Sequence, residues 1–287
     1  MPTARNYVSP QFVNARHWLC LQPHVAVSKA QGLGYRVGVM AVIAVLVLQC
    51  VMNAITTEEE FLAEMNRMSS EISQCMTLFY QYIEINNYAA EKREIFDALN
   101  NNGEFWNVNN YALQQTMFIS LGRIFDSGKD THSIYKLLKA ARVNRQFFSK
   151  SALLARRMKN LAKKPDFMDE FIAAAHEPTE HELHMIKDSL KAAGAKYTAV
   201  YGNIRNQHIG HTIVRDRPAI DLMYGKVVLA ETREVFYALA DAMFVLRQLW
   251  DNGRKPVMGK LKLTTPERVA KQTRAALDGL KIRRAKR

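Results

Sequence analysis

The sequence predicts an all-α protein, a bundle of about five main helices with a basic helical extension at the C-terminus. From Thr57 onward, apolar residues recur about every 3.6 positions, which is the period of an amphipathic helix. The alternation of apolar and polar residues that is typical of strands is hard to find, and the sequence contains no internal repeat. With 287 residues, the chain can form one large domain or two small ones.

The first expected helix begins after Thr57, which precedes three glutamates that favour a helix N-terminus. Apolar residues from Phe61 to Ile83 then share one face. The same period predicts further helices over Ala89–Leu99, over Phe105–Phe125, in "IYKLLKAAR" after its cap Ser133, and around 147–162 and 167–175.

A long helix is expected to begin at Thr179, which forms a capping box with Glu182. Its apolar seam steps by alternating three and four residues, as in helices that pack along their whole length. The seam comprises Leu183, Ile186, Leu190, Ala193, Tyr197, Val200 and Ile204. Continuing the same steps reaches Gln207 and His211, so the seam turns polar at its end.

The remaining helices are expected over 226–250 and, in a basic segment opened by Thr265 and Pro266, over 266–284. These elements suggest three regions: an N-terminal extension at 1–56, a helical domain at 57–252 and a basic tail at 253–287.

The N-terminal extension contains a twelve-residue apolar run, Val37–Leu48. A membrane-spanning helix needs about 20 such residues, so a true span is not expected. Three interpretations stay open: a weak membrane anchor, a signal peptide, and a natural start at Met52 that leaves residues 1–51 outside the native protein.

The net charge of +13 is concentrated at the two ends. Residues 1–57 contain four Lys or Arg and no acid, while residues 254–287 contain twelve Lys or Arg and two acids. A basic tail attracts polyanions, either nucleic acid or an anionic membrane face, or it is a solvated tail that only aids solubility. The cysteines Cys20, Cys50 and Cys75 have no metal-binding spacing, which suits a reducing compartment and predicts a cytoplasmic protein.

The segment "NIRNQHIGHTI" concentrates groups that suit metal-free cleavage of RNA. Arg205 offers a planar fork that suits a phosphate, and Asn206 can hold a phosphate oxygen. His211 can take or give a proton near neutral pH, and His208 could serve as a second donor. Arg205 and His211 would lie ~9 Å apart along an ideal helix and ~120° apart around it. A complete site therefore needs a distortion at Gly210, another helix or another copy of the chain.

Arg205, Asn206 and His211 resemble the R-x(4–6)-H signature of the HEPN superfamily. The stretch from Ala112 to Arg142 also resembles the AbiU-type abortive-infection HEPN-like proteins, in which an arginine-x-x-aspartate closes a helix. Arg123 and Asp126 match that pattern, and the likeness extends over roughly 57–250.

The resemblance implies an RNase toxin of bacterial antiphage defence that needs no cofactor. It implies a homodimer in which two copies of the motif share one cleft. Arg205 would then clamp phosphate, His211 would act as acid and base, and Asn206 would position the substrate. A neighbouring defence protein or antitoxin is a further expected partner, and membrane association is not expected.

Two other interpretations compete with this one. The cluster could instead stabilise a non-catalytic helical interaction protein or bind a nucleotide. Arg205 would then pair with an acid such as Asp126. Arg123 and Asp126 are expected to form an ion pair that braces the site.

A metal site is not expected. The histidines of "HEPTEHELH", His176, His181 and His184, fall one residue short of an H-E-x-x-H zinc motif and suit a solvated helix start.

Overall fold

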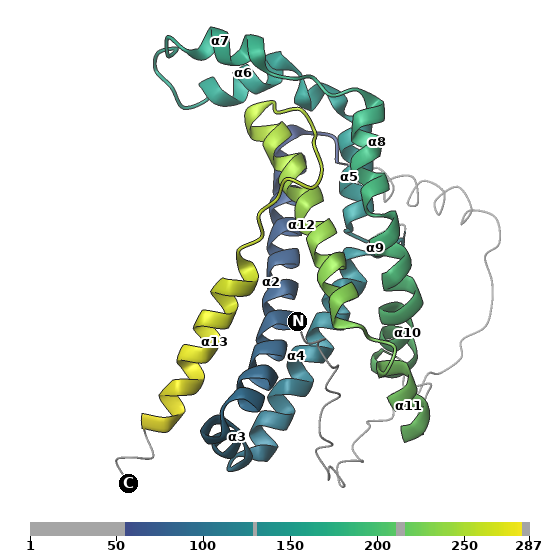
Figure 1. The fold of residues 1–287 in the computed structure, drawn as a ribbon. Coiled ribbons are helices and arrows are strands. Elements are labelled where there is room, and N and C mark those ends of the chain that lie inside the picture. Colours follow the sequence, from purple (N-terminus) through teal and green to yellow (C-terminus); the bar gives the residue numbers. More distant parts are fainter. Residues whose placement is uncertain (1–54, 129–130, 211–215, 283–287) are drawn as a thin grey trace, which may run out of the picture. The chain divides into compact units, whose positions relative to one another are not determined.

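A computed structural model describes residues 55–128, 131–210 and 216–282 (Figure 1). The described residues all belong to one compact unit of the chain. Over these residues the chain is helical and contains no strand, which confirms the predicted all-α class. The apolar run Val37–Leu48 and the alternative start at Met52 lie outside the described residues.

The bundle is formed by long helices that pack against α2, Glu58–Glu91. The helices in contact with α2 are α3 (Arg93–Asn100), α4 (Gly103–Ile124), α5 (Ile134–Val143), α12 (Leu229–Asn252) and α13 (Thr265–Ile282). The helix start predicted at Thr57 is confirmed, and it forms a capping box, because Thr57 and Glu60 bond to each other's backbone N–H groups. α2 extends to Glu91, so the expected helix from Ala89 is divided at Lys92, whose backbone is extended.

An aromatic cluster forms the core where α2 begins. The Phe61 ring lies 5.1 Å from Trp250 and 5.6 Å from Phe148, measured between ring centroids. The Arg156 guanidinium covers Trp250 at 3.9 Å and forms an ion pair with Glu58. This region includes short helices between α5 and α8: η1 (Arg145–Phe148), α6 (Lys150–Met158) and α7 (Met168–Ala174).

The helix expected to begin at Thr179 starts there with its capping box, but it is not one uniform α-helix. It runs as α8 (Glu180–Ser189), α9 (Lys191–Lys196), the π-helical turn η2 (Tyr197–Tyr201), α10 (Gly202–Ile204) and the π-helical turn η3 (Arg205–Ile209). The predicted seam is confirmed, since all its members up to Ile204 are buried except Val200, which is partly buried against the core. The apolar spacing therefore survives the change of helix type.

Helix α11, Arg217–Tyr224, lies between the predicted seam and the helix predicted over 226–250, where the sequence predicted no helix. Asp216 caps it by accepting a hydrogen bond from the Ala219 N–H, and Pro218 lies in its first turn. Both features are helix-start signals.

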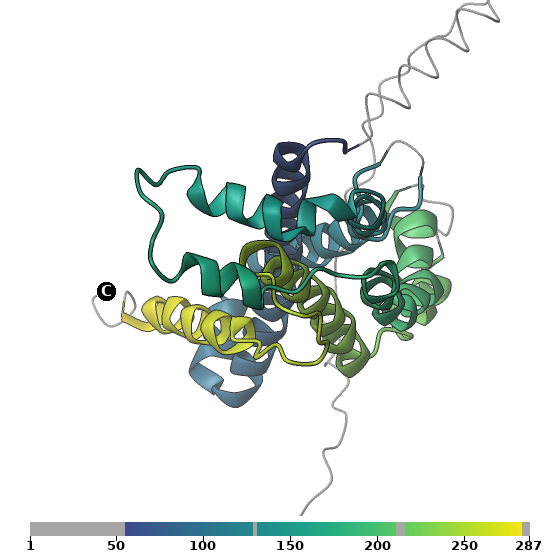
Figure 2. The same cartoon turned by 90° about the horizontal axis from the view of Figure 1, so that it is seen from above.

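The basic C-terminal stretch includes a helix that is packed onto the body. α13 buries Val269 and Leu277, and Arg274 forms ion pairs with Glu84 at 2.5 Å and Glu91 at 3.1 Å. Figures 1 and 2 place α13 on the opposite side of α2 from α8–η3.

None of the helices among the described residues combines the length and apolarity needed to cross a bilayer. Cys75 is buried, and burial raises the pKa of its thiol; Cys20 and Cys50 lie outside the described residues.

Candidate functional site

Arg205 begins the π-helical turn η3, which packs against α4. The turn is closed by a hydrogen bond of 2.7 Å from the Gly210 N–H to the Arg205 carbonyl oxygen, five residues back. Single π-helical turns inside α-helices recur at functional sites. Arg205 is partly exposed, so its guanidinium is anchored by the bundle and still accessible.

The Arg205 side chain lies across the backbone of α4 at Gly122. A Cβ atom at position 122 would lie 2.6 Å from Arg205 Cδ and 2.7 Å from its Nε, closer than van der Waals contact allows. Gly122 is therefore the residue type that this approach requires. Sequence reasoning missed Gly122, because a helical glycine carries no signal of which distant side chain covers it.

Tyr197 stands next to Arg205 and was predicted only as a member of the apolar seam. Its ring stacks on Phe125 with centroids 5.1 Å apart and planes 16° from parallel. Burial raises the pKa of Tyr197, while the positive charge and hydrogen bonding of Arg205 act in the opposite direction. The Tyr197 phenol thus borders the guanidinium on the bundle side.

Asn206 and His208 lie on the same turn as Arg205. Arg205 Nη1 donates a hydrogen bond of 3.2 Å to Asn206 Oδ1, so the two predicted site residues are brought together. The His208 ring meets Tyr224 edge to face at 5.8 Å, and its Nδ1 is buried without a hydrogen-bond partner. Tyr224 in turn accepts a hydrogen bond of 3.0 Å from Gln115. His208 therefore faces α11 and α4, and is less accessible than expected for a donor to substrate.

His211, the expected acid and base, lies outside the described residues. The described part of the segment ends at Gly210, directly after η3. The predicted roles of His211 and its partnership with Arg205 remain predictions.

The bracing ion pair expected between Arg123 and Asp126 is replaced by other contacts. Arg123 Nε forms an ion pair of 2.6 Å with Glu71 on α2, and Arg67 approaches the same carboxylate at 2.9 Å. Asp126 accepts a hydrogen bond of 2.8 Å from the Gly128 N–H. The helical i, i+3 geometry does not apply to the pair, because α4 ends at Ile124, before Asp126.

Two of the three histidines considered for zinc, His176 and His184, contact neighbouring carboxylates, and His181 is exposed. His176 Nε2 lies 2.9 Å from Glu182, and His184 Nε2 lies 3.4 Å from Asp188. In the part of the chain that the structure describes, no group of three or more His, Cys, Asp or Glu side chains is placed to hold a metal ion.

Residues 58–265, more than half of the chain, match the family model HEPN_AbiU2, described as AbiU2. The match includes α2 to α12, the Arg205 turn and the loop that leads to α13. No curated protein and no solved structure gives a significant match. The chain therefore belongs to the AbiU2 family of HEPN proteins.

Proposed function

We propose that this protein is a metal-independent endoribonuclease, an RNase toxin that acts in the cytoplasm as part of a bacterial abortive-infection system. Membership of the AbiU2 family of HEPN proteins supports the biological setting. The observation that carries the chemistry is the Arg205 guanidinium, held across Gly122 beside Asn206 and left partly exposed. A fixed and accessible guanidinium suits a phosphate whose negative charge increases during reaction.

In the proposed reaction the ribose 2′-oxygen attacks the adjacent phosphorus. His211 takes the 2′-hydroxyl proton as the new P–O2′ bond forms, and the P–O5′ bond then breaks. The proton passes to the leaving 5′-oxygen, which leaves a 2′,3′-cyclic phosphate and a 5′-hydroxyl. Arg205 stabilises the phosphorane, and Asn206 orients a phosphate oxygen. The nucleophile belongs to the substrate, so no metal-bound water is needed.

The proposed active form is a homodimer, in which the 205–211 segments of two copies share one cleft. An exposed apolar stripe on α4, the helix that carries Gly122, supports such a contact. Phe105, Val108 and Tyr111 follow one another at three-residue spacing and are 60%, 62% and 57% exposed. Exposed aromatic residues gathered on one helix are typical of protein–protein contacts.

The same stripe favours a second candidate function, that of a non-catalytic interaction protein. In that case α4 would bind an antitoxin or another defence protein, and the Arg205 cluster would stabilise the assembly or bind a nucleotide. Toxicity on expression separates the two functions. A nuclease loses toxicity when Arg205 or His211 becomes alanine, whereas an interaction protein of this kind gives no RNA cleavage that depends on either residue.

The direct test measures cleavage of single-stranded RNA and tRNA by the full chain in excess EDTA. Arg205→Ala and His211→Ala should abolish cleavage and preserve the helical circular dichroism spectrum. Arg217→Ala is the matched control, because Arg217 is an exposed arginine on α11 that pairs with Asp221. Undiminished cleavage by Arg205→Ala, or cleavage that appears only with added Mg²⁺, would contradict the proposal.

A further inference from the structure

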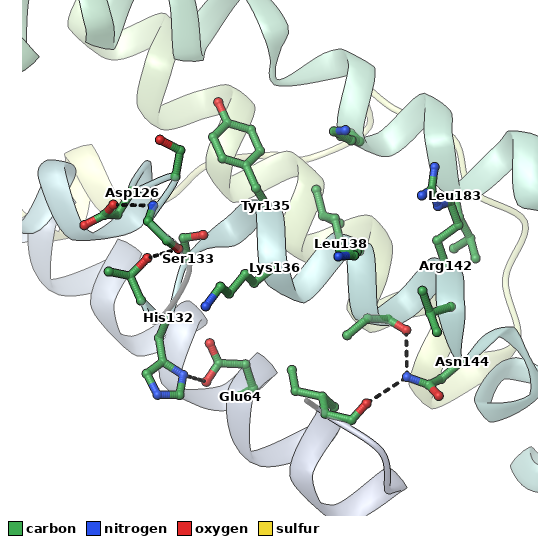
Figure 3. Close-up of a pocket in the computed structure, with 18 of the residues that line it drawn as sticks. Glu64, Asp126, His132, Ser133, Tyr135, Lys136, Leu138, Arg142, Asn144 and Leu183 are labelled. Atoms are coloured by element: carbon green, nitrogen blue, oxygen red, sulfur yellow. Dashed lines mark hydrogen bonds and ion pairs between the residues drawn. The ribbon is translucent and has the colours of Figure 1, made fainter. Parts of the chain in front are cut away.

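A cavity of about 750 Å³ lies beside α5, and its lining includes neither Arg205 nor Asn206. Its walls come from α5, from α8, from the start of α2 and from the segment after α4. In Figure 3, Asp126, His132, Ser133 and Lys136 gather at one end, and Leu183, Arg142 and Asn144 lie at the other. The volume is within the range of small-molecule sites.

The charged side chains around this cavity are mainly cationic. Lys136, Lys139 and Arg142 follow one another at three-residue spacing along α5, and Lys187 faces them from α8. Arg142 also approaches Glu180 at 3.7 Å, a long and largely exposed pair that leaves its charge available.

Among the described lining residues, the two carboxylates each accept hydrogen bonds from protein groups. Glu64 is 7% exposed and accepts a hydrogen bond of 2.6 Å from Arg67 and one of 3.1 Å from His132. Asp126 accepts from the Gly128 N–H. Among the described lining residues, the four cationic side chains of Lys136, Lys139, Arg142 and Lys187 outnumber the two carboxylates, which favours an anion.

The start of α5 lies at the end of the cavity where Figure 3 shows Ser133 and Lys136, and its backbone N–H groups are hydrogen-bond donors there. Ser133 occupies the N-cap position of this ten-residue helix, but its side chain makes no capping hydrogen bond. Ser133 is 1% exposed, and its hydroxyl oxygen is buried without a partner. Native proteins rarely leave a buried hydroxyl unpaired, and the uncapped N–H groups of a helix start bind anions.

We propose that this cavity binds a small organic phosphate. The phosphate would lie at the start of α5, where Ser133, the backbone N–H groups of the first turn and Lys136 can contact it. Lys139 and Lys187 would add charge along the walls, and the apolar side chains of Leu138 and Leu183 suit the organic part. This site does not require the protein to cleave RNA.

The test is isothermal titration of the full chain with pyrophosphate and with ribose 5-phosphate, with ribose as the uncharged comparison. Both phosphates should bind, and ribose should not. The double variant Lys139→Ala/Lys187→Ala should weaken binding about tenfold or more, because it removes two cavity charges. Lys163→Ala/Lys271→Ala is the matched control, since it removes two exposed lysines elsewhere and should leave affinity within about twofold.

Ser133→Ala separates a binding role from a structural one. It should weaken phosphate binding about threefold or more and leave the melting temperature of the ligand-free protein unchanged or raised, because it removes an unpaired buried hydroxyl. Three results would overturn the proposal: no binding of either phosphate, equal losses in the cavity and control double variants, or binding abolished by Arg205→Ala, which would place the phosphate at the RNA site.

Discussion

The Arg205 side chain, on η3, lies over Gly122 in the last turn of the neighbouring helix α4. The contact joins two residues 83 positions apart and fixes the guanidinium against a backbone surface without a side chain. Because the approach tolerates no Cβ atom, Gly122 is a positioning residue for Arg205, and the contact can be tested separately from the chemistry.

Gly122→Ala should displace the Arg205 side chain and reduce RNA cleavage by about tenfold or more, since misplacement of a phosphate clamp by an ångström costs about that or more. Single-turnover cleavage in EDTA measures the effect. Gly103→Ala is the control, because a Cβ atom there meets nothing within 4 Å. It should keep full activity and add up to about 1 kcal/mol to the free energy of unfolding. Equal activity of the two variants would show that the Gly122 contact does not position Arg205.

Glu71 should contribute more to stability than an exposed carboxylate, because it is 10% exposed and pairs with both Arg67 and Arg123. Glu71→Gln should lower the free energy of unfolding by about 1–2 kcal/mol. This loss is smaller than for a fully buried ion pair, because solvent screens the charges of the partly exposed arginines. Urea unfolding measures this loss. Asp97→Asn, which breaks the exposed pair with Arg93, should cost under about 0.5 kcal/mol. A loss at Asp126→Asn as large as at Glu71→Gln would favour the ion pair first expected for Arg123.

The capping box of α8 should give the protein an acid-sensitive part of its stability. The pKa of Glu182 is lowered to about 2 from an ordinary 4.5. The main cause is the hydrogen bond from the Thr179 backbone N–H, and the hydrogen bond with His176 adds to it. The folded-state pKa is depressed, so this stability is fully present above pH 4.5 and is lost as the pH falls toward 2.

Urea unfolding between pH 6 and about 2.5 checks the effect of Glu182. Glu182→Gln should lower stability at pH 6 and reduce its decline with acid, while Glu170→Gln, at an exposed position, should leave the profile unchanged. Matching profiles for the wild type and Glu182→Gln would remove the capping box as the cause.

Helix α13 should stabilise the body through its buried face. Leu277 is 2% exposed and packs in a small cluster with Ile85, Tyr88 and Ile95. Leu277→Ala should cost about 2–5 kcal/mol in thermal or urea unfolding, as for other large-to-small changes in a core. Lys271→Ala on the exposed side of the helix should stay within about 0.5 kcal/mol. A Leu277→Ala variant as stable as Lys271→Ala would mean that α13 does not dock on α2 in solution.

Much of the fold follows from the sequence, because apolar spacing and capping residues are local signals. Thr57 and Thr179 begin helices as predicted, and the seam from Leu183 to Ile204 is largely buried. The break at Lys92 and the π-helical turns were not predicted, since they leave the apolar spacing almost unchanged.

The candidate site was predicted less completely, because its partners are distant in the sequence. Arg205 and Asn206 form a recognisable pair, but neither Gly122 nor the glutamate that holds Arg123 can be found without the packing of η3 and α2 against α4. The Arg123–Asp126 expectation failed because α4 ends before the aspartate.

The central claim is that RNA is cut by its own 2′-hydroxyl with help from Arg205 and His211. Mass spectrometry of the ends produced from a defined single-stranded RNA, in excess EDTA, tests it most directly. The products should have 2′,3′-cyclic phosphate and 5′-hydroxyl ends, a 2′-deoxy-substituted site should stay uncut, and Arg205→Ala should give no products. Ends with a 5′-phosphate and a 3′-hydroxyl, or cutting at the 2′-deoxy site, would contradict it.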